Sequence, residues 1–290
     1  MTSPAVATGH EAPSLRTVLT PTEAGGGSAS ALVPAVTRAF AVLELLAAEG
    51  EPASLSRIAS SLALPKSSVH ALCRTLAHLG YLRRFDDGSY FLGARVLELA
   101  HAFTSRTQVV DEFQRIWAER GDPPEETIIL SVLDGPDIVY VGARPGSHPL
   151  GLAFHVGMRL PAHLAATGKA MLAFHDPAEV RARLPASLAP MVQGRGPVPI
   201  DEFLSEMADT RRRGYSIDDE GVREGIYCYG APVLDAAGQP VAGVGVCIPK
   251  PLLPSSGERL RGVVIHVATR LSERIGGPGV AAAAISGPKS

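Results

Sequence analysis

The stretch that most constrains this fold covers residues 52–85, where two short amphipathic segments are separated by a tight break. Ser54 is a favoured helix-capping residue, and the apolar side chains after it recur at helical spacing: Leu55, Ile58 and Leu62. Pro65 suits the first turn of a second helix, because its missing N–H costs no hydrogen bond there. The pattern predicts two helices joined by a turn at Ala63-Leu64.

The flanking residues complete a small domain over residues 33–93. Residues 34–48 predict a preceding helix whose apolar face carries Val36, Phe40, Leu43 and Leu46. The helix that starts near Pro65 is expected to bury Val69, Leu72, Cys73, Leu76 and Leu79 and to stop at Gly80. The segments YLRRF and SYFL flank Asp86-Asp87-Gly88, which indicates a hairpin. Helices followed by a hairpin predict a winged helix-turn-helix.

The charge of this domain favours a polyanionic partner. The chain has 27 basic and 29 acidic residues, yet residues 52–85 hold no Asp or Glu. Phosphate oxygens favour such a surface by counterion release, and a thin helix with short polar side chains at its start fits a DNA groove. The residues expected to contact double-stranded DNA are Arg57, Lys66, Ser67, Ser68, His70 and Arg74, with Arg84, Ser89 and Tyr90 of the wing beside the backbone.

An alternative interpretation is a small helical domain with a solvated basic face, because helix-turn-helix folds also serve as protein-binding modules. The sequence does not distinguish which of Ser67, Ser68 and His70 would touch a base.

Composition places the chain among soluble globular proteins. Its 290 residues predict about two domains, with 46% hydrophobic and 19% charged residues. No apolar run is long enough to predict a membrane span. The three cysteines lack CxxC spacing, which argues against a disulfide framework or a zinc finger and favours a reducing, cytoplasmic location. Residues 1–31 and 276–290 have the composition of a disordered leader and tail.

The remaining residues predict a linker helix and an α+β domain. Residues 94–119 form one amphipathic helix whose apolar surface needs a partner, and a second subunit is expected to supply it. In residues 126–275, strands are predicted at TIILSVLD, DIVYVGAR, GYSID, IYCYGAPVLD and QPVAGVGVCIP. Helices are predicted over 163–174, 201–213 and 255–275. Strands joined by hairpins and mixed with helices indicate a mostly antiparallel sheet covered by helices.

Three segments resemble the IclR family of bacterial transcriptional regulators. LPKSSVHALCRTLAHLGYLRR, with FLGARVLELA after it, is similar to that family's winged helix-turn-helix. GMRLPAHLAATGKAMLA and RRRGYSIDDEGVREGIYCYGAPVLDAAGQPVAGVGVCIP are similar to its effector-binding domain. The resemblance covers residues 33–275 and implies a GAF-like C-terminal domain. It also implies a homodimer or homotetramer that binds a palindromic operator, most often as a repressor, and senses a small organic acid.

The same resemblance implies an effector site. Ala166 and Thr167, before Gly168-Lys169, would offer backbone N–H groups to a ligand carboxylate. This Gly-Lys pair is not a nucleotide loop, because His163 and Ala170 stand where a P-loop needs Gly and Ser or Thr. Other residues implied at the site are Leu152, Leu160, Asp218, Ile226, Cys228, Gly245 and Cys247. The family often has two hydroxyl residues at the last-strand positions held here by Gly245 and Cys247. We therefore expect a roomier pocket and a larger or aromatic acid.

Each site residue also has a structural interpretation. Cys228 and Cys247 are small strand residues suited to a packed core, and Asp218 is suited to capping a turn. Two other functions remain open at this point: a Cys-dependent enzyme with Cys228 as nucleophile beside Asp218, and a protein-binding sensor module. His148, His155, His163 and His175 fit no zinc spacing, so no metal and no cofactor is expected.

Overall fold

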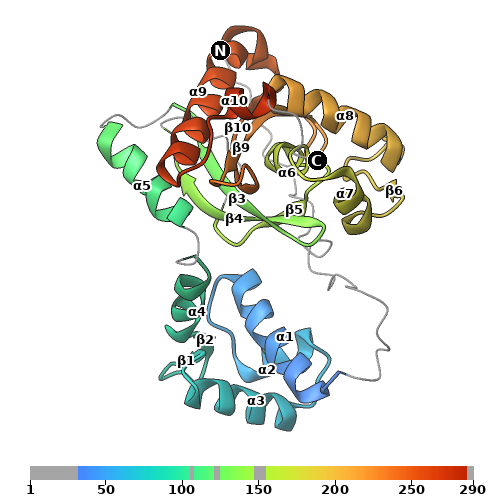
Figure 1. Ribbon diagram of the computed structural model, residues 1–290. Helices are drawn as coiled ribbons and strands as arrows, with labels where there is room; N and C mark the ends of the chain where they lie inside the picture. The colour runs from blue at the N-terminus through green and yellow to red at the C-terminus, as the bar shows by residue number, and fades with distance from the viewer. Residues whose placement is uncertain (1–31, 105–107, 121–124, 147–154, 286–290) are drawn as a thin grey trace, which may run out of the picture. The chain divides into compact units, whose positions relative to one another are not determined.

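The chain forms two compact units that divide between His101 and Ala102 (Figure 1). The computed structural model describes residues 32–104, 108–120, 125–146 and 155–285. The expected disordered leader, Leu152, His148 and the last five residues of the expected tail lie outside the described residues. Each unit is considered by itself.

The N-terminal unit is the expected winged helix-turn-helix. It contains α1 (Pro34–Glu49), α2 (Leu55–Ser61), α3 (Lys66–His78), β1 (Leu82–Arg84) and β2 (Tyr90–Leu92). The hydroxyl of Ser54 caps α2 by accepting the N–H of Arg57 at 3.3 Å. Ala63 adopts a positive φ of 52°, which lets the chain reverse within the short turn before α3. Antiparallel β1 and β2 form the wing.

The core of this unit is narrower than the apolar pattern predicts. Val42 and Leu46 of α1 pack with Ile58, Val69, Cys73 and Leu76. Leu79 is more than half exposed, so the expectation that it is buried is wrong, and Val36 and Phe40 on the apolar face of α1 are more than half exposed as well. Val36 and Phe40 lie on a strip of α1 beside the one that faces α3. Leu79 caps the C-terminus of α3, where the chain turns away toward β1.

The segment expected to form a linker helix holds two described helices, α4 (Arg95–Thr104) and α5 (Gln108–Arg120). Residues 105–107 lie outside the described part of the chain. Val109, Phe113 and Trp117 of α5 are buried in the core of the C-terminal unit. The apolar face of α5 is therefore covered by its own chain, and the second subunit expected there is not needed. Leu97 and Leu99 of α4, by contrast, are 72% and 57% exposed.

An antiparallel sheet of six strands forms the centre of the C-terminal unit, in the order β5-β4-β3-β10-β9-β8. The strands are β3 (Ile128–Asp134), β4 (Asp137–Arg144), β5 (Arg159–Pro161), β8 (Ser216–Asp219), β9 (Ile226–Leu234) and β10 (Pro240–Pro249). The predicted α+β class is confirmed, and the arrangement is that of a GAF-like domain. A second small hairpin, β6 (Ser187–Leu188) with β7 (Val198–Pro199), was not predicted.

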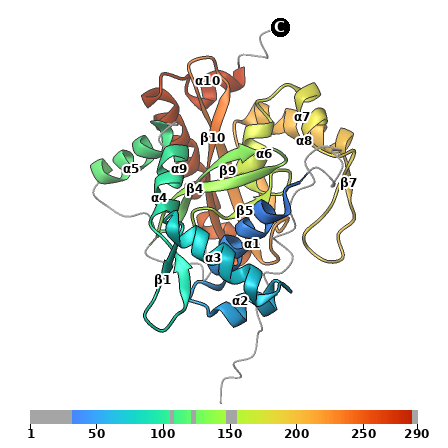
Figure 2. The same cartoon turned by 90° about the horizontal axis from the view of Figure 1, so that it is seen from below.

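Helices cover both faces of this sheet (Figures 1 and 2). On one face, α9 (Leu253–Arg274) and α5 pack against alternate residues of β9 and β10, Ala231, Val233, Val244 and Val246 among them. On the other lies α6 (Ala166–Leu172), which packs against α8 (Ile200–Arg213), while α7 (Pro177–Arg183) belongs to the same core. A last helix, α10 (Val280–Ile285), buries Val280, so residues 276–285 are not the disordered tail that we expected.

Candidate functional site

The exposed face of α3 carries cationic and hydroxyl groups. Lys66, Ser67, His70 and Arg74 are exposed and Ser68 is half-buried, while Val69, Cys73 and Leu76 on the opposite side are buried. The first turn holds no acidic residue. Because the first N–H groups of a helix have no partner within the helix, this end of α3 favours an anion. Arg84 of the wing is exposed as well.

Three other residues expected to contact DNA are engaged elsewhere. Tyr90 is 3% exposed and lies in the core. Its backbone, at the start of β2, pairs with Ala53 on one side and with Arg84 on the other, which fixes the side chain in the interior. Ser89 is buried too, and its hydroxyl donates to the Asp87 carboxylate at 2.6 Å, which closes the wing turn. The expectation of exposed contacts at Ser89 and Tyr90 is therefore wrong. The Arg57 guanidinium pairs with Glu49 at 3.2 Å and with Glu51 at 3.1 Å, two carboxylates just outside the basic stretch.

In the C-terminal unit, three of the expected effector residues form one row across the sheet. Asp218 on β8 is paired with Cys228 on β9, and Cys228 is paired with Cys247 on β10. Residues that pair across neighbouring strands point to the same face of a sheet. All three side chains are buried, and Ala166 and Ile226 pack against the two cysteines. Strand register thus brings together three of the expected residues, and packing adds Ala166 and Ile226 to them.

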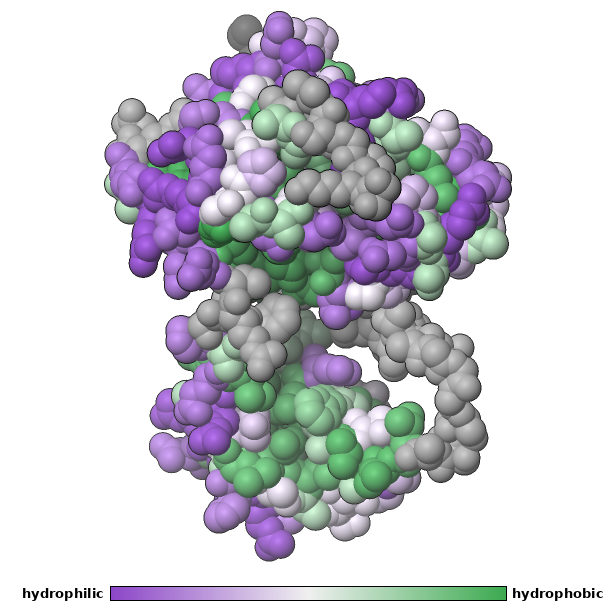
Figure 3. Space-filling model, in the orientation of Figure 1, coloured by the Kyte–Doolittle hydropathy of each residue, from purple (hydrophilic) through white to green (hydrophobic). Residues whose placement is uncertain are grey.

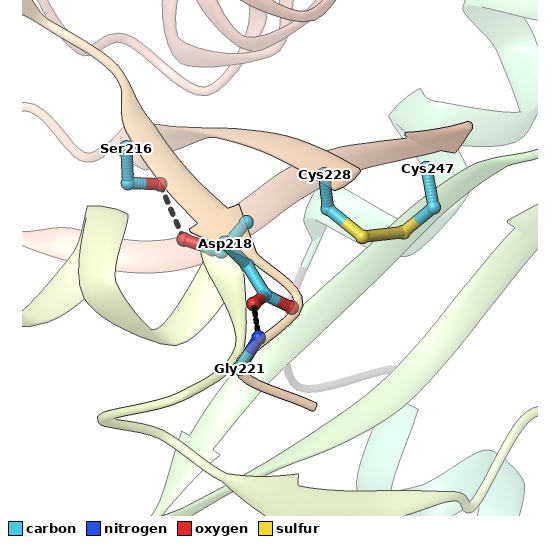
Figure 4. Close-up of a disulfide and its surroundings, with 6 residues drawn as sticks. Ser216, Asp218, Gly221, Cys228 and Cys247 are labelled. Atoms are coloured by element: carbon cyan, nitrogen blue, oxygen red, sulfur yellow. Dashed lines mark hydrogen bonds between the residues drawn. A yellow bond between two sulfur atoms is a disulfide. The ribbon is translucent and has the colours of Figure 1, made fainter. Parts of the chain in front are cut away.

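Cys228 and Cys247 are joined by a disulfide, with their Cα atoms 4.1 Å apart (Figure 4). This corrects the expectation that the cysteines form no disulfide. Directly opposed residues of an antiparallel pair approach most closely where they exchange no backbone hydrogen bonds, which brings two thiols within bonding reach. The third cysteine, Cys73, is free and buried in the N-terminal unit, and burial raises the pKa of its thiol to about 11.

Glycines let α6 sit directly on this face of the sheet. A Cβ at Gly230 would lie 2.5 Å from the carbonyl of Ala166, and one at Gly245 would lie 2.7 Å from Cγ2 of Thr167. The hydroxyl of Ser131 donates to that of Thr167 at 2.7 Å, and both residues are buried. Our expectation that Gly245 enlarges a ligand pocket is therefore wrong, because Thr167 fills the space above it.

Asp218 is the most strongly perturbed carboxyl near the row. Burial raises its pKa to about 6, although Gly221 donates a backbone N–H to its Oδ1 at 2.6 Å and Lys169 lies near enough to oppose the shift. Burial and the charge of Asp218 together raise the pKa of Tyr140 on β4. Asp218 thus caps its turn, as the structural interpretation supposed, and also stays protonated well above the usual range for a carboxyl.

A cavity of about 290 Å³ lies beside Asp218, and its lining includes Lys169 of α6 with Glu206 and Phe203 of α8. Lys169 and Glu206 form an ion pair with 2.9 Å between Nζ and Oε1. Among the expected effector residues that the structure describes, Asp218 is the one that lines this cavity. Leu160 lies in the core beneath α6 and α8. No sequence pattern indicated this cavity, because its walls come from segments far apart in the chain.

The described residues contain no group of three or more His, Cys, Asp or Glu side chains that could hold a metal ion. Of the four histidines considered above, the three that the structure describes each have a partner: His155 lies 3.2 Å from the carbonyl of Val156, His163 lies 2.9 Å from the carbonyl of Ala189, and His175 lies 3.2 Å from Glu179. Among the helices that can be described, none has the length and apolar character needed to cross a membrane.

Comparison with known proteins settles the family. Residues 35–85 match the IclR helix-turn-helix domain, and residues 101–273 match the C-terminal domain of the bacterial transcriptional regulator IclR. The second match alone spans more than half of the chain. This chain belongs to the IclR family. It is a transcriptional regulator with a DNA-binding domain and an effector domain, and the relatives that it matches are regulators rather than enzymes.

Individual relatives cover most of this IclR-family regulator. The glycerol operon regulatory protein of Streptomyces coelicolor is 34% identical over 74% of the chain and 84% of its own length. The transcriptional repressor IclR of Escherichia coli is 28% identical over 76% of the chain and 82% of its own length. The crystal structure of Thermotoga maritima IclR superposes with a TM-score of 0.70 at 26% identity, over 83% of this chain and 98% of that one.

Proposed function

We propose that this IclR-family regulator is a cytoplasmic repressor that binds a palindromic operator as a dimer or tetramer and responds to a small organic acid. The observation that carries the proposal is the exposed start of α3, where Lys66, Ser67 and His70 stand clear of the core. Repression is supported by the likeness to the relative named transcriptional repressor IclR. A cytoplasmic location follows because the operator is chromosomal DNA.

Removing two cations from α3 tests the DNA contacts. In a gel shift with the DNA upstream of the chain's own gene, Lys66→Ala with Arg74→Ala should weaken binding by at least about thirtyfold, since each of the two lost contacts is worth roughly 1–3 kcal/mol. The matched control is Arg181→Ala with Arg212→Ala, which removes the same charge from exposed, ion-paired positions on α7 and α8. Equal binding by both double variants would reject these contacts.

Salt dependence separates DNA reading from the protein-binding alternative. The affinity of a DNA complex falls steeply with salt, because binding releases counterions from phosphate. The double variant should show a shallower slope, by about one unit for each phosphate that it no longer neutralises. A complex whose affinity barely changes with salt would favour a protein partner instead.

The proposed dimer rests on apolar side chains exposed on the N-terminal unit. Leu97 and Leu99 project from α4, and Val36 and Phe40 project from α1. Figure 3 shows hydrophobic residues gathered over α1 on the face in view. An exposed apolar patch is typical of an interaction surface, and a symmetric pair of recognition helices would match a palindromic site. Light scattering should give a dimer or larger species for the native chain and a monomer for Leu97→Glu with Phe40→Glu.

The proposed effector site is the row of Asp218, Cys228 and Cys247, together with the first residues of α6. A carboxyl whose pKa is about 6 keeps part of its protonated form near neutral pH and can then donate to a ligand carboxylate. Ala166 and Ile226 add apolar surface beside it. Gly245 does not support the prediction of an aromatic acid, because Thr167 covers that glycine. The apolar surface of Ala166 and Ile226 is the remaining support for an aromatic ligand.

Thermal-shift screening against aliphatic and aromatic carboxylic acids tests the effector class, since a ligand that binds only the native state raises Tm. An acid whose carboxylate accepts a hydrogen bond from protonated Asp218 should bind more tightly as the pH falls toward 6, and Asp218→Asn should remove that dependence. The absence of stabilisation by any acid would remove the support for an acid effector.

A further inference from the structure

The two cysteines bonded across β9 and β10 stand at the proposed effector site, not at a place where the fold needs reinforcement. Strand pairing already joins β9 to β10 from Leu234↔Pro240 to Ile226↔Pro249. The bond lies inside the regular part of this ladder, which runs from Ala242↔Val233 to Pro249↔Ile226, so the strands are paired on either side of it. The bond instead changes the chemistry of the surface beside Asp218 (Figure 4) and beside Ala166, which packs on the pair.

The compartment makes a permanent bond at this position unexpected. A regulator that binds chromosomal DNA works among glutathione and thioredoxin, which keep most protein thiols reduced. Disulfides that do form there are usually transient and serve catalysis or redox sensing. Strand register holds the two cysteines directly opposite each other, and opposed residues of an antiparallel pair lie about 4.5–5.5 Å apart at Cα, within the range that a disulfide spans.

We propose that Cys228 and Cys247 are a reversible redox pair, oxidised by hydroperoxides and reduced by thiols, that changes the response of the proposed effector site. The proposal rests on the assignment of that site under the proposed function. It adds a second input, an oxidant, to a regulator whose family assignment predicts a small-molecule effector.

The oxidation balances with a hydroperoxide as the oxidant. One thiolate attacks an oxygen of the O–O bond, giving a sulfenic acid and releasing water or an alcohol once a proton is taken up. The second thiolate attacks the sulfur of the sulfenic acid, forms the S–S bond and releases a second water. Overall, two thiols lose two electrons and two protons, and the peroxide accepts them. Reduction by two equivalents of a thiol reverses the change.

Oxidation alters what the site offers to a ligand. Two thiols present two S–H donors and can rotate about χ1, whereas the disulfide has no donor and fixes both sulfur atoms between the strands. Ala166, at the start of α6, packs on the pair, and the Ser216 hydroxyl holds its carbonyl from β8. A change at the pair therefore acts directly on the residues that are expected to hold an effector carboxylate.

The third cysteine supplies an internal control. Cys73 is fully buried in the N-terminal unit, and burial raises the pKa of its thiol, which leaves little thiolate to react. Peroxide should therefore leave Cys73 reduced while it couples the other two. Cys73→Ala is the matched control variant, because it removes a thiol and leaves the pair intact.

Mass spectrometry tests the chemistry on the full chain. Protein reduced with dithiothreitol and then treated with stoichiometric hydrogen peroxide should lose about 2 Da, the mass of two hydrogen atoms. Alkylation after unfolding should label Cys73 alone, and dithiothreitol should restore labelling at all three cysteines. A bond that native protein retains in dithiothreitol would show a structural disulfide and overturn the proposal. Failure of peroxide to form the bond would overturn it too.

Binding measurements test the regulatory consequence. Affinity for the upstream DNA should differ at least about fivefold between the reduced and oxidised chains, the lower end of typical allosteric couplings. Cys73→Ala should keep this difference. Cys228→Ser and Cys247→Ala, made separately so that poor folding of one leaves the other, should each abolish it. Equal affinity in both states would overturn the redox proposal while leaving the DNA-binding function intact. Failure of the reduced chain to bind any upstream DNA would instead count against the proposed function.

Discussion

At the scale of single residues, burial decides what each candidate side chain can do. Lys66 and Arg74 are exposed on α3, whereas Tyr90, which belongs to the same DNA-binding unit, lies in the core. Asp218 is held in the interior by a backbone N–H from Gly221, in surroundings that disfavour its charge. Its protonation therefore couples the stability of the C-terminal unit to pH.

Asp218 should make the C-terminal unit less stable as pH rises. Its folded pKa of about 6 exceeds the unfolded value of 3.8, so between these pH values the folded state binds more protons. Stability then falls from about pH 4 to about pH 6 and levels off above, a loss of roughly 2–3 kcal/mol. Asp218→Asn should flatten this profile. Denaturant unfolding followed by Trp117 fluorescence measures it, with exposed Glu224→Gln as the control. A profile unchanged by Asp218→Asn would contradict the assignment.

At the scale of elements, the close approach of α6 to the sheet depends on glycines in the strands beneath it. Glycines at 230, 243 and 245 remove the side chains that would otherwise hold the helix away. In the sequence these glycines only lower the β propensity of segments that otherwise predict strands. Their role follows from the structure, where Thr167 and Ala166 lie in contact with them.

Adding a methyl group beneath α6 should destabilise the C-terminal unit. Gly245→Ala would set a Cβ 2.7 Å from Cγ2 of Thr167 and should cost about 1–3 kcal/mol, as overpacking does. Thr167→Ser lacks that Cγ2 but keeps the hydroxyl bonded to Ser131, so the double variant should recover most of the loss. Gly262→Ala, in open space on α9, is the control and should not destabilise. Chemical denaturation of all four proteins gives the comparison.

At the scale of the whole molecule, the boundary between the units falls within the segment expected to be one linker helix. α4 extends across His101 and Ala102, whereas α5 buries Phe113 and Trp117 in the core of the C-terminal unit. The C-terminal unit therefore begins before its first strand. A fragment that starts at β3 would leave the apolar surface under α5 uncovered.

A fragment covering residues 102–290 should fold by itself. The chain has one tryptophan, Trp117, so its fluorescence reports directly on the docking of α5. We expect the fragment to show the same buried-tryptophan emission as the full chain and to unfold cooperatively. Phe113→Ala should weaken docking and cost about 3–5 kcal/mol, the usual range for truncating a buried phenylalanine. A red-shifted, solvent-exposed emission from the native fragment would show that α5 needs the N-terminal unit.

Local patterns were enough to predict much of the fold. Ser54, Pro65 and Gly88 mark helix starts and a hairpin through backbone preferences that act within a few residues, and the observed elements begin and turn at or beside them. The strands of the effector domain likewise follow from apolar runs between turn residues. The exposure of Val36 and Phe40 could not be predicted, because a helical pattern shows an apolar face but not which part of it meets a neighbour.

By itself the sequence determined the family, the winged helix and the antiparallel order of the hairpins, since these depend on short-range spacing and recognisable segments. Only the tertiary structure decided that Cys228 meets Cys247, that Thr167 covers Gly245 and that α10 is ordered. Each depends on which distant surfaces come into contact. Burial, register and close approach arise from the assembled layers, and no local preference encodes them.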